Sequence, residues 1–297
     1  MTSAQERRDP GSSNGINGEG GIQTPPDAEH KRLLEKWEKA PIRILRYPSG
    51  MHPNPPKDPY RYKKGVRLFV NGLQVMDTCE TPWCEATVSE AFKAIREQKR
   101  EGPYIVFERG FGLGITARQI VKHLDLLGGR YDVVELNASI AKRARVFADT
   151  QTQAWRAIKG DLPAESHSAS IKVYEGDAIL ATRKRAQKIS EGREEPADII
   201  ISDTYPLSTD EQGINDLLDL GTLKHCLSPH GIFTFYPYFP GSTGGIIKAQ
   251  RDLIAKHFRD YRYLEVQVNP SPQYRYLHTG DVPVRTLPVV ICRYPKI

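Results

Sequence analysis

The chain has 297 residues, of which 39% are hydrophobic and 26% are charged, and its formal net charge is +6. This length allows one large domain with a sizeable core and additional segments. The basic residues are dispersed among acids without an aromatic-rich basic stripe, which disfavours a nucleic-acid-binding protein. The apolar runs fall short of the ~20 residues of a membrane span, and the polar start lacks the core of a signal peptide. We therefore expect a cytoplasmic protein without nucleic-acid or membrane partners.

The cysteines and histidines do not have the spacing of metal ligands. No Cys-x-x-Cys pair occurs among the four cysteines, and the eight histidines form no His-x-x-x-His pair. The expectation is neither a metal site nor a structural disulfide. The cysteines are Cys79, Cys84, Cys226 and Cys292.

The amino-terminal part of the chain divides into two segments ahead of one main domain. Residues 1–28 are rich in Gly, Ser, Asn and Pro and are expected to form a disordered tail. Residues 29–65 begin with Leu33, Leu34 and Trp37 at helical spacing, which predicts a short helix followed by a lid segment. The main domain is expected to span residues 66–297.

A glycine-rich turn after an apolar run is the strongest local signal in the chain. Residues 104–114 read Tyr-Ile-Val-Phe-Glu-Arg-Gly-Phe-Gly-Leu-Gly, which predicts a buried strand, a sharp turn and then a helix over 116–127. The third glycine comes one residue too early for the dinucleotide fingerprint, which favours an adenosyl ligand without a pyrophosphate. A second predicted strand ends at Glu135, where an acid can bind ribose hydroxyls.

Apolar strand-like runs alternate with helical segments through most of the main domain, which predicts a parallel sheet with helices on both faces. The last two runs are joined by a proline-rich loop too short for a crossover helix, so they should form an antiparallel hairpin at the edge of the sheet. This α/β arrangement, a mostly parallel seven-stranded sheet, is expected of a Rossmann-like class I methyltransferase. The predicted strands are 104–108, 133–136, 171–174, 198–202, 232–235, 263–268 and 287–292.

Acids stand at the ends of four predicted parallel strands. Any one of them, taken alone, reads as an ordinary loop or capping acid, but four at one edge of a sheet predict a negative pocket for a cationic ligand. The acids are Glu108, Glu135, Asp177 and Asp203. Aromatic faces of Tyr205, Tyr236 and Tyr238 are candidates for the walls of this pocket, although aromatics in such strands usually belong to the core.

A helix start lies earlier in the chain, at Glu80-Thr81-Pro82. Thr81 has the character of a helix cap and Pro82 of a first helical residue. On the residues alone, Glu80 is expected to be an exposed residue preceding the helix.

Together, several motifs resemble guanidinoacetate N-methyltransferase and its relatives that methylate arginine guanidino groups, over about residue 66 to the carboxyl terminus. The motifs are Val75-Met76, Glu80-Thr81-Pro82, Glu108-Arg-Gly-Phe-Gly-Leu113, Glu135-Leu-Asn137 and Asp203-Thr-Tyr-Pro-Leu207. The resemblance implies S-adenosyl-L-methionine as cofactor, bound by Met76, Glu108, Gly110, Phe111, Gly112, Leu113, Glu135, Leu136, Asn137, Asp177, Ala178 and Asp203. It also implies that Glu80 and Asp203 hold the guanidino group, with Tyr205, Tyr236, Tyr238 and Phe239 in the substrate site.

The chemistry of a guanidinium also requires such a pair of acids. The group is planar and almost always protonated, so its nitrogen is a poor nucleophile until its charge is localised and a proton can leave. Asp203 is assigned as the proton acceptor and Glu80 as the orienting acid.

The chain departs from the family at the part of the site that would hold the substrate tail. Residues 237–239 read Pro-Tyr-Phe where the family has Asn-Leu-Thr, and Thr78-Cys79 replaces Arg-Trp. The predicted substrate is therefore free L-arginine or guanidinoacetate. The alternatives are a protein-arginine N-methyltransferase and, in another class, a basic nucleic-acid-binding protein on an inactive methyltransferase fold. The sequence leaves the oligomeric state open, a homodimer included.

Overall fold

The computed structural model describes residues 28–51, 61–98, 102–159, 169–205, 215–237, 248–271, 278–279, 282–283 and 285–296. Residues 1–27 of the expected tail lie outside this description. Among the described residues, no helix combines the length and apolar character needed to cross a membrane.

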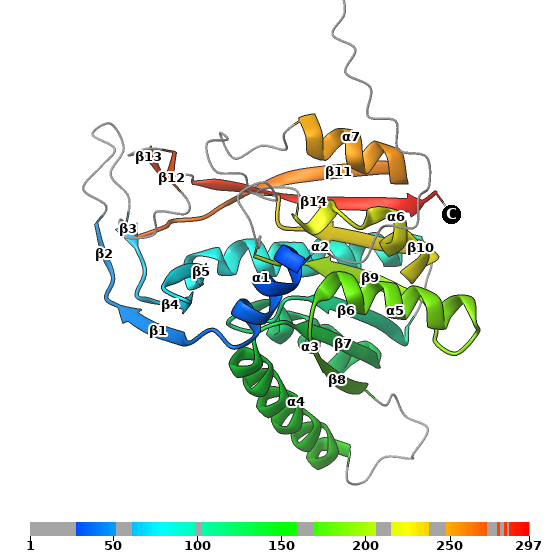
Figure 1. Ribbon diagram of the computed structural model, residues 1–297, viewed down its shortest axis with the longest axis horizontal. Coiled ribbons are helices and arrows are strands. Elements are labelled where there is room, and N and C mark those ends of the chain that lie inside the picture. The colour runs from blue at the N-terminus through cyan, green and yellow to red at the C-terminus, as the bar shows by residue number, and fades with distance from the viewer. Residues whose placement is uncertain are drawn as a thin grey trace, which may run out of the picture.

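A seven-stranded sheet forms the centre of the protein (Figure 1), and its order is β11-β14-β10-β9-β6-β7-β8. Strands β8, β7, β6, β9 and β10 run parallel, whereas β14 runs antiparallel to both β10 and β11. The predicted parallel sheet with an antiparallel edge hairpin is confirmed. The strands are β6 (Tyr104–Arg109), β7 (Gly129–Glu135), β8 (Ala169–Glu175), β9 (Ala197–Ser202), β10 (Leu227–Phe235), β11 (Phe258–Gln267) and β14 (Thr286–Pro295).

Helices cover both faces of this sheet. One face packs against α2, α3 and α4, and the other against α5, α6 and α7. Strand β9 is buried along its whole length because it lies at the centre of the sheet between these two layers. The helices are α1 (Ala28–Glu38), α2 (Thr81–Glu97), α3 (Ile115–Leu127), α4 (Ala138–Lys159), α5 (Ala178–Ser190), α6 (Leu220–Leu223) and α7 (Lys248–His257), with 3-10 turns η1 (Thr78–Glu80), η3 (Asn215–Leu217) and η4 (Lys224–Cys226).

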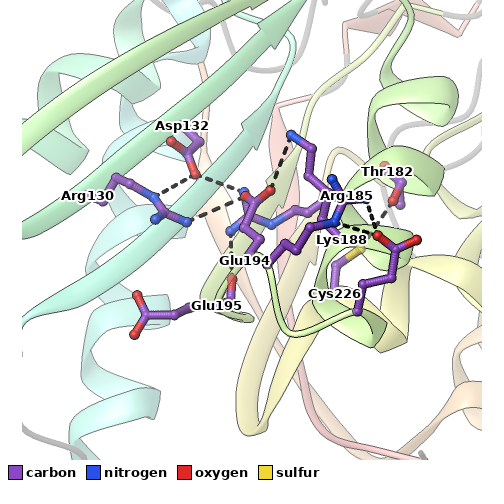
Figure 2. Close-up of polar contacts among 10 residues, drawn as sticks. Arg130, Asp132, Thr182, Arg185, Lys188, Glu194, Glu195 and Cys226 are labelled. Atoms are coloured by element: carbon purple, nitrogen blue, oxygen red, sulfur yellow. Dashed lines mark hydrogen bonds and ion pairs between the residues drawn. The ribbon is translucent and has the colours of Figure 1, made fainter.

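A network of ion pairs joins α5 to the sheet (Figure 2). The Nη1 atom of Arg185 lies 2.8 Å from Oδ2 of buried Asp132 on β7 and 2.7 Å from Oε1 of Glu194. Arg130 donates to the same Asp132 oxygen over 2.9 Å. Such a network fixes orientation more than it adds stability, because burying the charges costs solvation. The network fixes α5 against β7, and the amino end of α5 lies at the carboxyl edge of the sheet.

A three-stranded antiparallel sheet, β1-β4-β5, precedes the central sheet and was not predicted. Its strands are β1 (Ile42–Tyr47), β4 (Gly65–Val70) and β5 (Leu73–Asp77). No side chain of β1 is fully buried, so its sequence lacks a clear inner face, and the neighbouring prolines and basic residues resemble a loop. The pairing of β1 with β4 joins the expected lid segment to the expected main domain. Two short pairs complete the described strands: β2 (Gly50–Met51) with β3 (Arg61–Tyr62), and β12 (His278–Thr279) with β13 (Val282–Pro283).

Candidate active site

A cavity lies at the carboxyl edge of the parallel strands, where open α/β sheets bind their ligands. The four predicted strand-end acids all line it, and so does Glu80 from the turn before α2. Segments from seven parts of the chain meet there. The lining residues are Trp37, Val70, Val75, Met76, Glu80, Glu108, Arg109, Gly110, Phe111, Gly112, Thr116, Val134, Glu135, Leu136, Asn137, Ile140, Gly176, Asp177, Ala178, Ile179, Asp203, Thr204, Tyr205, Asn215, Leu218 and Tyr236.

The glycine loop after β6 packs directly against two other walls of the cavity. Gly110 has φ +89°, and a Cβ there would lie 2.3 Å from the backbone oxygen of Asp203. Gly112 has φ +51°, and its Cβ would lie 2.7 Å from Sδ of Met76. Both positions therefore need glycine for backbone conformation and for space.

Glu135 organises this loop from the end of β7. Its Oε2 accepts from the backbone N–H groups of Phe111 at 2.9 Å and Gly112 at 3.4 Å, and its Oε1 accepts from Asn137 N at 2.9 Å. Burial raises the pKa of Glu135, while these backbone donors oppose the rise. These backbone donors fix the orientation of the Glu135 carboxylate at the edge of the cavity.

Glu108, at the end of β6, is fully buried in the same edge. The hydroxyl of Tyr131 donates to its Oε2. Burial raises the pKa of Glu108 well above its usual range, and Asp203 and Glu135 add to the rise by repulsion. The phenol of Tyr131 works in the opposite direction because it stabilises the carboxylate.

Asp203 follows β9 and remains partly exposed within the cavity. The next residue is held firmly: Thr204 donates to Oδ1 of buried Asp216 through its N at 3.1 Å and its hydroxyl at 2.6 Å. Burial raises the pKa of Asp203 well above its usual range, followed by repulsion from Glu80, Asp216 and Glu135. Burial and mutual repulsion therefore favour the neutral forms of these acids in the ligand-free protein, and a cationic ligand would relieve the repulsion.

Glu80 is buried, with 4% of its surface exposed, so the expectation of an exposed residue before the helix is wrong. Its Oε2 accepts from Asp77 N at 3.1 Å, and Asp77 in turn caps the η1 turn by accepting from Cys79 N at 2.8 Å. Thr81 does not cap α2, because its hydroxyl donates to the carbonyl of Thr78 at 2.7 Å. The extra turn η1 rotates Glu80 inward, which the local pattern did not reveal.

The small sheet braces this turn through Asp77. Nε of Arg67 on β4 lies 3.1 Å from Oδ2 of Asp77, and the hydroxyl of Tyr47 on β1 donates to Oδ1. The guanidinium of Arg67 also lies 4.2 Å from the centroid of the Tyr47 ring. The unpredicted sheet thus supports the residue that orients Glu80.

Helix α1 closes one side of the cavity with Trp37. The Trp37 ring lies 5.2 Å from that of Tyr205, and Nδ2 of Asn137 donates to the carbonyls of Trp37 and Ala40 at 2.9 Å each. The sequence predicted this helix as part of a lid segment, but Trp37 was not among the predicted site residues. Its helical spacing with two leucines was the available signal, and that spacing does not show what the helix packs against.

The structure brings together most of the predicted site residues. All of the predicted cofactor residues line the cavity except Leu113, which is buried in the core and donates its N–H to Sδ of Met76 at 3.1 Å. Tyr205 and Tyr236 also line it. Tyr238 and Phe239 lie outside the described residues, so their predicted contacts stay predictions.

One charged residue of the lining was missed. Arg109, directly after Glu108, is buried, and its Nη1 lies 2.8 Å from Oδ1 of Asp219. Its charge is therefore directed to α6 on the other side of the sheet. No pattern in the sequence pairs two residues so far apart.

No family model matches the chain, and none of the curated proteins does. Among solved structures, the chain is similar to a spermidine synthase from Thermotoga maritima, with a TM-score of 0.51, 14% identity, and coverage of 84% of this chain and 72% of that one. A spermidine synthase in complex with the transition-state analogue AdoDATO gives a TM-score of 0.50, 15% identity and the same coverage. The chain therefore has the Rossmann-like fold of these spermidine synthases.

Proposed function

We propose that this protein is an S-adenosylmethionine-dependent N-methyltransferase acting on the guanidino group of a small molecule, with free L-arginine ahead of guanidinoacetate. One observation carries the proposal: Glu80 and Asp203, from different parts of the chain, line the same cavity as the glycine loop and Glu135. A site with two acids beside an adenosyl-type pocket suits a planar cation next to a sulfonium.

The residues of the cavity fit the cofactor. The glycine loop carries no side chain at its turns, and Glu135 is held where it can accept ribose hydroxyls. Met76, Glu108, Asn137 and the turn at Asp177 would complete the site. The complex of a spermidine synthase with AdoDATO supports an adenosyl ligand for this fold. The cofactor supplies an electrophilic methyl group on sulfur.

The two acids perform separate tasks in the proposed reaction. Glu80 is hydrogen-bonded through both oxygens and buried, so its position is set before a substrate enters. It orients the guanidinium plane and offsets its charge. Asp203 accepts the proton that the guanidino nitrogen loses as it gains the methyl group. Burial and repulsion raise the pKa of Asp203 in the ligand-free protein, and the guanidinium cation favours its ionised form, which can accept the proton.

The closed side of the cavity supports a small substrate over a peptide. Trp37 and Tyr205 form an aromatic pair at the lining, and Asn137 fixes the chain that carries Trp37. A protein-arginine methyltransferase needs an open groove for a polypeptide on this side. We therefore place protein substrates second.

The test is mass spectrometry of products after incubation with methyl-labelled cofactor and a panel of compounds. The panel contains L-arginine, guanidinoacetate, an arginine-containing peptide and, because two solved proteins of this fold are spermidine synthases, a diamine with decarboxylated cofactor. The expected result is a labelled methyl group on a small guanidino compound. Labelling of the peptide alone would favour the protein-directed alternative, and aminopropyl transfer to the diamine would refute methylation.

A further inference from the structure

We propose that Tyr236 is a positioning residue, which holds the Glu80 carboxylate at a set place relative to Asp203 so that the two acids can grip one guanidinium. The inference rests on the proposed function and deepens it by adding the group that sets the geometry of the acid pair. Tyr236 acts through Glu80 in this proposal and has no part in proton transfer.

Tyr236 is connected to both acids by different parts of the same residue. Its hydroxyl donates to Oε1 of Glu80 at 2.7 Å. Its backbone N–H donates at 2.9 Å to the carbonyl of Ser202, the residue directly before Asp203. Glu80 and Tyr236 are 156 positions apart, so this contact joins the turn before α2 to the end of β10. The length of one tyrosine side chain thereby sets the spacing between the two acids.

The ring of Tyr236 has little freedom to turn away. It lies edge-on to Trp83, with ring centroids 4.8 Å apart at an interplanar angle of 81°. Trp83 has 1% of its surface exposed, and its Nε1 donates to the carbonyl of Pro288 at 3.0 Å. The phenol is thus aimed at Glu80 by a buried support that reaches β14.

Each oxygen of the Glu80 carboxylate accepts a hydrogen bond from a different part of the chain. Oε1 accepts from Tyr236 and Oε2 from Asp77 N, which is one direction of each oxygen. The two carboxylate oxygens lie in one plane, as do the paired N–H groups of a guanidinium, so a carboxylate fixed in this way suits a bidentate contact. Both carboxylate oxygens are therefore prepositioned, which lowers the entropy lost when a planar cation binds.

Several titratable groups face Glu80 besides the phenol. Asp203 lies across the cavity, and the thiols of Cys79 in η1 and Cys84 on α2 are close enough for Glu80 to raise their pKa values. Burial is the main cause of the raised pKa of both thiols, so they stay neutral. The phenol of Tyr236 differs from these groups because it donates a hydrogen bond to Glu80.

The experiment compares Tyr236→Phe with the wild-type protein and with the control Tyr263→Phe. The control removes the same hydroxyl group from a residue on β11 that is 58% exposed. Removing one hydrogen bond to a charged group should raise KM for the guanidino substrate about tenfold, while kcat changes less than about threefold. The Kd for S-adenosylhomocysteine and the melting temperature should stay near the wild-type values. Tyr263→Phe should match wild type throughout.

A second readout does not depend on the substrate. Carbon-13 labelling of glutamate, with Glu80→Gln to assign the resonance, follows the titration of the Glu80 carboxyl by NMR. Loss of the phenol should move this titration to higher pH, because a donor to the carboxylate favours its charged form. If no guanidino compound is methylated but the Glu80 titration moves to higher pH, the proposed function is refuted, whereas the positioning of Glu80 by Tyr236 is supported. An unchanged titration, or a loss of cofactor affinity equal to that of substrate, overturns the positioning role.

Discussion

The substitution Asp203→Asn separates catalysis from folding, because it removes a charge and a base without changing the shape of the side chain. A general base contributes about 10²- to 10⁴-fold to rate. A hydrogen bond to a charged partner contributes about 1.5–3 kcal/mol. We therefore expect kcat/KM to fall at least ~10³-fold, while the Kd for S-adenosylhomocysteine changes less than about threefold, since Glu135 serves the ribose.

The same substitution should stabilise the ligand-free protein at neutral and basic pH. Burial and repulsion raise the pKa of Asp203 in the folded state. Folding therefore favours the protonated carboxyl, and stability falls as the pH rises through the folded pKa. Each unit of that rise corresponds to about 1.4 kcal/mol. For a protein of 297 residues, that is roughly 2–3 °C in melting temperature. Near pH 4 the difference should disappear, because aspartic acid and asparagine are then both neutral.

The assay is a thermal unfolding series from pH 4 to pH 8.5 on both proteins, with isothermal titration of S-adenosylhomocysteine and turnover of the substrate found in the panel. The expected pattern is lost turnover, retained cofactor affinity and a melting temperature that exceeds wild type more as the pH rises. Near-normal turnover would show that Asp203 is not the proton acceptor. A lower melting temperature at pH 8 would show that the acids do not repel one another as described.

Three further substitutions test other parts of the site. Gly110→Ala should lower kcat/KM at least about tenfold, because its Cβ would lie 2.3 Å from the backbone oxygen of Asp203. The control Gly72→Ala, with φ +78° and nothing within 4 Å of its Cβ, should cost only about 1–2 kcal/mol of stability and leave turnover normal. Equal losses of kcat/KM in both variants would contradict the packing argument. Glu135→Gln should weaken S-adenosylhomocysteine binding about tenfold or more by titration calorimetry, because an amide cannot accept on both sides from Phe111 N and Asn137 N. The control Glu175→Gln should bind S-adenosylhomocysteine as the wild-type protein does. Unchanged affinity in Glu135→Gln would show that Glu135 has no role in cofactor binding. Trp37→Ala should raise KM for the guanidino substrate about tenfold in steady-state kinetics, because the ring pair with Tyr205 is lost. The control is Leu126→Ala, at an exposed side chain of α3, and unchanged kinetics in Trp37→Ala would show that α1 does not close the site.

The fold was largely predictable because its signals are local. The inner parallel strands contain apolar runs with both faces covered, as in the wholly buried β9, and such runs stand out from the helices between them. The strand β1 was missed because its side chains are only partly buried, so no hydrophobic face marks it. A strand is visible in a sequence to the extent that it buries one face or both.

The strand-end acids were predictable for the same reason, since topology alone brings the carboxyl ends of parallel strands to one edge. The sequence by itself therefore determined the central sheet, the glycine loop and the negative edge formed by Glu108, Glu135, Asp177 and Asp203. Only the tertiary structure decided that Glu80 turns inward, that Trp37 closes the cavity and that Tyr236 reaches Glu80 across 156 positions. These contacts form between elements that approach only when the whole chain is packed, and no periodicity along the chain encodes the distance between them.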